Sequence, residues 1–187
     1  VNLIDELKIN KIHLVGFSIG SLIARNFATK FNDRLQSLTL LSSIYKRSEQ
    51  QQRIVNDRFD QAKKELKLSK QALKRWFTDK YLENNPDTYK KISSILSSNN
   101  IANFLKVYEL FVKHKNDEDF EKIKVNTLIM TGEYDIGSTI EMSEELNKII
   151  KNSELKIIKD GKHGYLFKLE DPEDLALKIL KVFQDNK

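Results

Sequence analysis

The stretch KIHLVGFSIG, residues 11–20, decides the fold. It runs from a short β-branched segment into Gly-x-Ser-x-Gly and then directly into a helix-forming run. This order is typical of a nucleophile elbow, a sharp strand-to-helix turn that lifts a serine hydroxyl out of the edge of a sheet. The stretch therefore predicts Ser18 as a candidate nucleophile.

The geometry of such a turn makes demands on its neighbours. The chain passes so close to itself that we expect a Cβ at Gly16 or at Gly20 to clash. Ser18 also lies at the start of a helix, where backbone N–H groups have no intrahelical partner and negative charge is favoured. The N–H of Ile19 is therefore predicted to point at a developing oxyanion. Because the pentapeptide alone also occurs in ordinary loops, the interpretation depends on the residues downstream.

Composition limits the classes of protein that the chain can belong to. Its 187 residues suffice for one domain with a sizeable core, and 40% hydrophobic with 32% charged residues are typical of a globular chain. No apolar run approaches membrane-spanning length, and residues 1–6 lack the layout of a signal peptide. We expect a cytoplasmic protein without a membrane partner.

Residue counts also exclude several kinds of site. The chain has no cysteine, which excludes disulfides, a thiol nucleophile and a cysteine-based zinc site. Its three histidines are far apart in the sequence, so we expect no metal and no cofactor. The net charge of +5 is spread along amphipathic helices between acidic residues, which favours a solvated surface and no nucleic-acid partner.

Four short apolar segments predict strands at residues 11–15, 38–41, 127–131 and 155–158. They alternate with helical patterns, which indicates an α/β fold with a parallel sheet. The segment 38–41 is nearly all apolar, as expected of a strand buried on both faces.

Helices account for the rest of the chain. The helix after the elbow is predicted to bury Leu22, Ile23, Phe27, Ala28 and Phe31 and to expose Arg25, Asn26 and Lys30. Residues 42–120 show helical patterns only, and Pro172 opens a final helix. We therefore expect residues 1–44 and 121–187 to form the α/β core, and residues 45–120 to form a helical cap inserted between strands.

Three residues with the chemistry of a hydrolytic site follow predicted strands. In an open parallel sheet ligands bind beyond the carboxyl ends of the strands. Ser18 follows the first strand, Asp135 the third and His163 the fourth, in the order Ser, Asp, His. We take Asp135 as the acid, with Glu133 or Asp160 as alternatives. His13 is interpreted as a core or edge residue and His114 as a solvated one.

These motifs, namely G-F-S-I-G, T-G-E-Y-D and D-G-K-H-G, resemble those of the α/β-hydrolase superfamily over essentially the whole chain. The insertion, with L-K-R-W-F-T-D-K-Y, resembles the caps of the 3-oxoadipate enol-lactonase and carboxylesterase-type branch. The resemblance implies that His163 takes the proton of Ser18, that Asp135 orients His163, and that a small ester or lactone is cleaved through an acyl-enzyme. Phe17, Trp76 and Phe77 are then expected to line the substrate pocket.

The sequence departs from this pattern in two places. Members of the superfamily usually have several strands before the elbow, and one of the loops there donates a second oxyanion N–H. We expect a carboxyl-terminal part of a longer hydrolase, slowed about a hundredfold to a thousandfold without that donor. Its open sheet edge would favour pairing with a second copy. Residues 136–140 also lack a proline common in relatives. The alternative is an inactive hydrolase fragment or an interaction protein with an unused triad.

Overall fold

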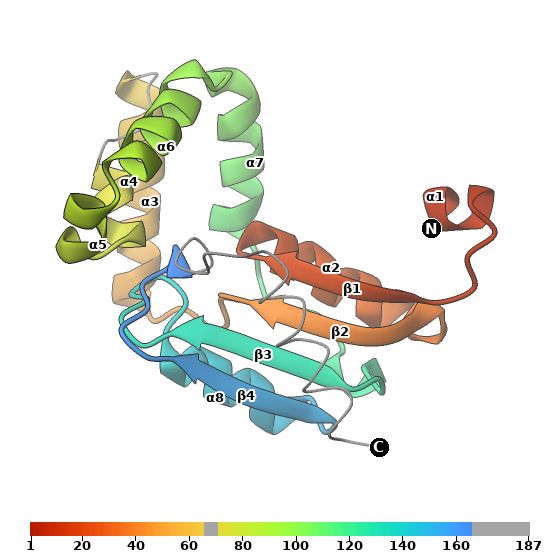
Figure 1. Cartoon of the computed structure of the whole chain (residues 1–187). Coiled ribbons are helices and arrows are strands. Elements are labelled where there is room, and N and C mark those ends of the chain that lie inside the picture. The colour runs from red at the N-terminus through yellow and green to blue at the C-terminus, as the bar shows by residue number, and fades with distance from the viewer. Residues whose placement is uncertain (66–70, 166–187) are drawn as a thin grey trace.

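The structure is a computed structural model that describes residues 1–65 and 71–165 (Figure 1). Its sheet contains β1 (Ile12–Phe17), β2 (Leu35–Leu41), β3 (Thr127–Gly132) and β4 (Ser153–Ile158). All neighbouring strands are parallel, in the order β1-β2-β3-β4. The predicted parallel α/β fold is confirmed, and β2 begins three residues earlier than its apolar run suggested.

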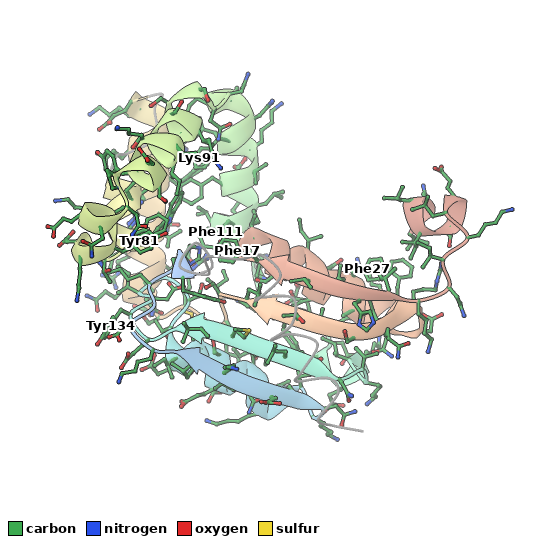
Figure 2. The ribbon with its side chains drawn as sticks, viewed as in Figure 1. Phe17, Phe27, Tyr81, Lys91, Phe111 and Tyr134 are labelled. Atoms are coloured by element: carbon green, nitrogen blue, oxygen red, sulfur yellow. The ribbon has the colours of Figure 1, made fainter. Side chains whose placement is uncertain are left out.

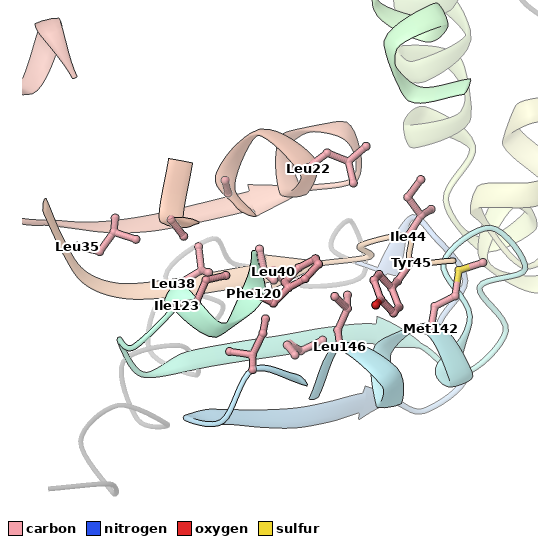
Figure 3. Packing of buried hydrophobic residues seen from close by; sticks show 14 residues of the cluster. Leu22, Leu35, Leu38, Leu40, Ile44, Tyr45, Phe120, Ile123, Met142 and Leu146 are labelled. Atoms are coloured by element: carbon pink, nitrogen blue, oxygen red, sulfur yellow. The ribbon is translucent and has the colours of Figure 1, made fainter. Parts of the chain in front are cut away.

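One face of this sheet carries the main hydrophobic core. It is covered by α2 (Ile19–Lys30), a 3₁₀ turn (Phe120–Lys122) and α8 (Ile140–Ile149). Figure 3 shows their apolar side chains meeting over the central strands. Leu38 and Leu40 of β2 are 0% exposed, as expected of a strand in the interior of a parallel sheet. A smaller cluster around Tyr165 covers the opposite face.

Between β2 and β3, the longer elements that the structure describes are all helices. They are α3 (Glu49–Glu65), α4 (Gln71–Trp76), α5 (Asp79–Asn84), α6 (Pro86–Ser98) and α7 (Ile101–Lys113). Figure 1 shows them standing at the carboxyl ends of the strands, whereas the short α1 (Asn2–Glu6) precedes β1 at the opposite end. The helix predicted from Pro172 lies outside the described residues. Among the helices that the structure describes, none has both the length and the apolar character needed to cross a membrane.

The buried face of α2 differs in part from the predicted one. Leu22 and Ala28 are buried as expected, but Ile23 and Phe31 are 68% and 37% exposed. The reason is the close approach of α2 to β1. A Cβ on Gly16 would collide with the carbonyl oxygen of Gly20 and lie 2.8 Å from the Cβ of Ala24. Only small side chains fit at this contact, so longer apolar residues lie on the flanks of the helix.

The prediction for Gly20 is wrong. A Cβ there would meet nothing within 4 Å. The backbone of Gly20 contacts Gly16, but a side chain on Gly20 would point into open space. The steric requirement for glycine in the elbow therefore falls on Gly16.

Arg25 is 0% exposed, which overturns its placement on the polar face of α2. Its Nη1 donates to the carbonyl oxygen of Ile44 at 2.6 Å, and its Nη2 donates to Glu118 Oε1 at 2.8 Å. His114 Nε2 lies 2.7 Å from Arg25 Nη2, so His114 is not a solvated residue either. Asn116 Oδ1 accepts a further bond from Nη2 at 3.0 Å. Arg25 thus ties the elbow helix to both ends of the helical insertion.

Glu118 is held as a carboxylate by this network. Burial alone would raise its pKa, but the hydrogen bond with His114 and the charge and hydrogen bonds of Arg25 outweigh burial and lower the pKa to about 2. Since the side chains of Arg25 and Glu118 are 0% and 1% exposed, each charge depends on the other for compensation.

Gly16→Ala and Gly20→Ala form a matched pair that tests the close approach of α2 to β1. Gly16→Ala should lower the free energy of unfolding by about 1–3 kcal/mol, because backbone must move to admit the methyl group. Gly20→Ala should leave it unchanged or raise it by up to about 1 kcal/mol, since alanine favours the helix. Urea denaturation measures both, and equal losses would contradict the described contact.

Arg25→Met tests the buried ion pair. We expect the free energy of unfolding to fall by about 3–5 kcal/mol, because Glu118 is left buried without its cation. Arg53→Met is the control, since Arg53 pairs with Glu49 on the surface, where the two side chains are 75% and 90% exposed. That change should cost less than about 1 kcal/mol. Similar denaturation midpoints for the two variants would show that Arg25 carries no such role.

Candidate active site

Ser18 lies in the turn between β1 and α2. Its backbone has φ 54° and ψ −120°, a strained conformation for a residue with a side chain. The turn is fixed to the sheet because the N–H of Ser18 donates to the carbonyl oxygen of Leu41 at 2.9 Å. Figure 2 shows the neighbouring Phe17 at the carboxyl end of β1, on the side where the inserted helices stand.

The structure brings together all three residues proposed from the sequence. His163 Nε2 lies 3.0 Å from Ser18 Oγ, and His163 Nδ1 lies 2.7 Å from Asp135 Oδ2. With Nδ1–H donating to the carboxylate, Nε2 is left as the acceptor for the serine hydroxyl. Residues 18, 135 and 163 thus form one hydrogen-bonded chain built from loops after β1, β3 and β4.

Asp135 is 4% exposed and its second carboxylate oxygen is also occupied. Oδ1 accepts hydrogen bonds from the N–H of Gly137 at 2.9 Å and of Ser138 at 3.0 Å. Burial by itself would raise the pKa of this carboxyl, but the hydrogen bond and charge of His163, followed by the two backbone N–H groups, lower it below its usual value. The acid is therefore ionised and fixed in orientation at neutral pH.

Two hydroxyl groups hold the loop that carries this acid. Ser138 Oγ donates to the carbonyl oxygen of Ser42 at 2.8 Å, and Thr131 Oγ1 donates to the carbonyl oxygen of Ser138 at 2.6 Å. These bonds fix the shape of residues 136–140, the stretch whose lack of a proline was noted in the sequence. This role of Ser138 and Thr131 was not predicted from the sequence. The signal in the sequence was the position of these two hydroxyl residues, a few residues before and after Asp135.

The other candidates for acid and base lie elsewhere. Glu133 Oε2 accepts a hydrogen bond from the N–H of Asp160 at 2.9 Å, which joins the loops after β3 and β4. His13 is exposed on β1, and its Nδ1 lies 2.6 Å from Ser37 Oγ. Among the described residues, Asp135 is the carboxylate that contacts His163.

The aromatic residues proposed as pocket walls divide into two kinds. Phe17 and Trp76 are half-buried, and the Phe17 ring centroid lies 5.1 Å from that of His163. Phe77 is only 1% exposed, and its ring stacks on Tyr81 with centroids 5.3 Å apart. A Cβ on Gly164 would lie 2.6 Å from Cε1 of Phe77. Phe77 therefore supports the loop that carries His163, while Phe17 and Trp76 keep part of their surface accessible.

Donors for a negative charge are provided by the elbow itself. Ile19 is the first residue of α2, so its N–H is one of the four that a helix leaves without an intrahelical partner. Within the part of the chain that the structure describes, no group of three or more His, Asp or Glu side chains lies together in a way that would hold a metal ion. The arrangement is suited to polarising a hydroxyl and accepting its proton.

Comparison with known proteins agrees with this fold. The curated (E)-2-((N-methylformamido)methylene)succinate hydrolase of Acinetobacter baylyi is 23% identical over 165 residues, covering 87% of this chain and 62% of that protein. 3-Oxoadipate enol-lactonase 2 of the same organism is 21% identical over 173 residues, covering 92% and 64%. The chain thus spans less than two thirds of the length of these two relatives.

Solved structures show the same architecture. The enol-lactonase from Burkholderia xenovorans LB400 superposes with a TM-score of 0.79 at 22% identity, covering 97% of this chain and 69% of that one. A family model described as alpha/beta hydrolase fold matches residues 1–168. The chain belongs to the α/β-hydrolase family.

Proposed function

We propose that this chain carries the catalytic residues of a serine hydrolase that cleaves a small carboxylic ester or lactone through an acyl-enzyme. One observation carries the proposal, namely the chain of hydrogen bonds from Asp135 Oδ2 to His163 (2.7 Å) and from His163 Nε2 to Ser18 Oγ (3.0 Å). Relatives named as enol-lactonases support the choice of substrate class.

The acylation step uses each of these groups. Ser18 Oγ attacks the carbonyl carbon while His163 Nε2 takes the hydroxyl proton. The resulting oxyanion accepts a hydrogen bond from the N–H of Ile19. When the C–O bond to the leaving group breaks, His163 returns the proton to the departing alkoxide. For a lactone that alkoxide stays on the acyl group, so the ring opens without loss of a fragment.

Deacylation repeats the steps of acylation with water as the nucleophile. His163 takes a proton from water, which attacks the acyl carbon, and then protonates Ser18 Oγ as the carboxylic acid leaves. Asp135 stays ionised throughout, fixing the tautomer of His163 and stabilising its cation. The low pKa of the Asp135 carboxyl supports this role.

Residues 45–120 act as a cap in this proposal, and residues 1–44 with 121–187 form the catalytic core. The position of α3 to α7 at the carboxyl ends of the strands supports this division (Figure 1). Phe17 and Trp76 then form part of the substrate pocket, between the cap and the elbow. Together these elements shield the acyl-enzyme from bulk water.

Covalent labelling by a fluorophosphonate tests the proposed nucleophile. Attack by Ser18 Oγ forms a P–O bond and expels fluoride, so intact-mass spectrometry should show one adduct, located by peptide mapping at Ser18. In Ser18→Ala the adduct should be absent, and turnover of p-nitrophenyl butyrate should fall by several orders of magnitude. Ser97→Ala, which removes an exposed hydroxyl on α6, should label and react like the original chain.

Labelling distinguishes a reactive serine with little turnover from an unreactive serine, which a turnover assay alone cannot do. An adduct with little turnover means an activated serine for which p-nitrophenyl butyrate is a poor substrate, which agrees with the proposed nucleophile. No adduct on a folded chain would contradict it and favour the alternative of an interaction protein with an unused triad.

A further inference from the structure

The loop that carries His163 follows β4, and the part of it before His163 is anchored to the α/β core. The carbonyl oxygen of Gly161 accepts a hydrogen bond from the N–H of Tyr134 at 2.7 Å. Gly132 and Gly161 also lie in direct contact, since a Cβ on Gly132 would be 2.5 Å from the carbonyl oxygen of Gly161. This half of the loop is therefore fixed to the end of β3 and the turn that follows it.

The anchors directly beside His163 come from the helical insertion instead. Lys162 Nζ donates to the carbonyl oxygen of Lys74 at 2.8 Å, and the N–H of Gly164 donates to the carbonyl oxygen of Trp76 at 2.7 Å. Both acceptors lie in the last turn of α4, where a helix leaves its carbonyl groups without intrahelical partners and favours a nearby cation. The end of α4 thus holds the residues on both sides of His163.

Phe77 fits the same loop by shape. It follows α4 directly, is 1% exposed, and packs with Leu73 and Ile92 inside the insertion. A Cβ on Gly164 would lie 2.6 Å from Cε1 and 2.8 Å from Cζ of the Phe77 ring, and 2.8 Å from the carbonyl oxygen of Trp76. A side chain at residue 164 therefore requires the ring or the end of α4 to move. The place of the loop is matched to the packing inside the insertion as well as to the sheet.

A small displacement of this loop would affect the chemistry. His163 reaches Ser18 Oγ at 3.0 Å and Asp135 Oδ2 at 2.7 Å through its two ring nitrogens, so movement of the loop lengthens at least one of these bonds. Proton transfer requires the heavy atoms to lie within about 3.2 Å. A misplacement of about 1 Å can cost about a hundredfold in rate. The alignment of the base therefore depends on the anchors at residues 162 and 164.

We propose that Lys162, Gly164 and Phe77 are positioning residues, through which the end of α4 aligns His163 with Ser18. This inference rests on the proposed function and deepens it, because it adds positioning residues to the same reaction. The three residues act through His163 and exchange no proton themselves. The insertion then has a role besides covering the site, since movement of α4 away from the core would draw the base away from the nucleophile.

Lys162→Met tests the hydrogen bond to α4, because it removes the donor and keeps an unbranched side chain. The rate of labelling of Ser18 by a fluorophosphonate should fall about three- to tenfold, since one of the two anchors beside His163 is lost. Lys162→Arg can still donate to the carbonyl oxygen of Lys74 and should recover most of that rate. Lys159→Met is the matched control, because Lys159 is exposed on the same loop and its side chain has no hydrogen bond or ion pair among the described residues.

Gly164→Ala tests the contact with Phe77. The added methyl group should slow labelling about tenfold or more. Phe77→Leu removes Cε1 and Cζ, the atoms that this methyl group meets, so Gly164→Ala should cost less rate in a Phe77→Leu background than in the original chain. An equal loss in both backgrounds, or labelling of Lys162→Met at the original rate, would overturn the proposal.

Proton NMR separates this inference from the proposed function, because it needs no reaction. The proton between His163 Nδ1 and Asp135 should give a resonance far downfield. It should broaden or move toward the amide region in Lys162→Met and stay unchanged in Lys159→Met, while circular dichroism and the denaturation midpoint remain those of the original chain. A displaced resonance in a chain that no fluorophosphonate labels would retain the positioning role and contradict the hydrolase. Labelling that is independent of Lys162 and Gly164 would retain the hydrolase and contradict the positioning role.

Discussion

The contact between β1 and α2 at Gly16 is the constraint on which the site depends. It lets the helix begin immediately after the strand, and this places Ser18 in a strained turn with φ 54°. Because β1, β2, β3 and β4 are parallel, the loops that follow them open at one edge of the sheet. The side chains of Asp135 and His163 therefore reach Ser18 although they are far from it in sequence.

A second constraint connects this core to the helices above it. Arg25 lies on the same helix that begins at the elbow, and its hydrogen bonds reach the chain both where it enters the insertion, at Ile44, and where it leaves, at Glu118. The insertion is also joined to the loop of His163 through Trp76. The positions of nucleophile, base and inserted helices are thus set by a few buried polar contacts as well as by the hydrophobic core.

The sequence was sufficient to predict the strands and the three polar residues of the site, because their positions follow from local patterns. Four apolar segments indicated the parallel sheet, and polar residues after three of them indicated the residues that the structure brings together. It was insufficient for Arg25, because a charged residue is assigned to solvent by periodicity alone, and its partner Glu118 lies 93 positions away. The prediction of a clash at Gly20 was wrong for a related reason. The motif shows that a glycine is present, but only the packing shows that its Cβ direction is open.

The hydrogen bond between His163 and Asp135 is the central claim, and proton NMR measures it most directly. A proton on His163 Nδ1 held by a buried carboxylate at 2.7 Å should give a resolved resonance far downfield of the amide region. This resonance should be lost in Asp135→Ala and in His163→Ala but retained in Glu133→Ala and Asp160→Ala. A downfield resonance that survives Asp135→Ala, or that disappears with Glu133→Ala, would contradict that claim.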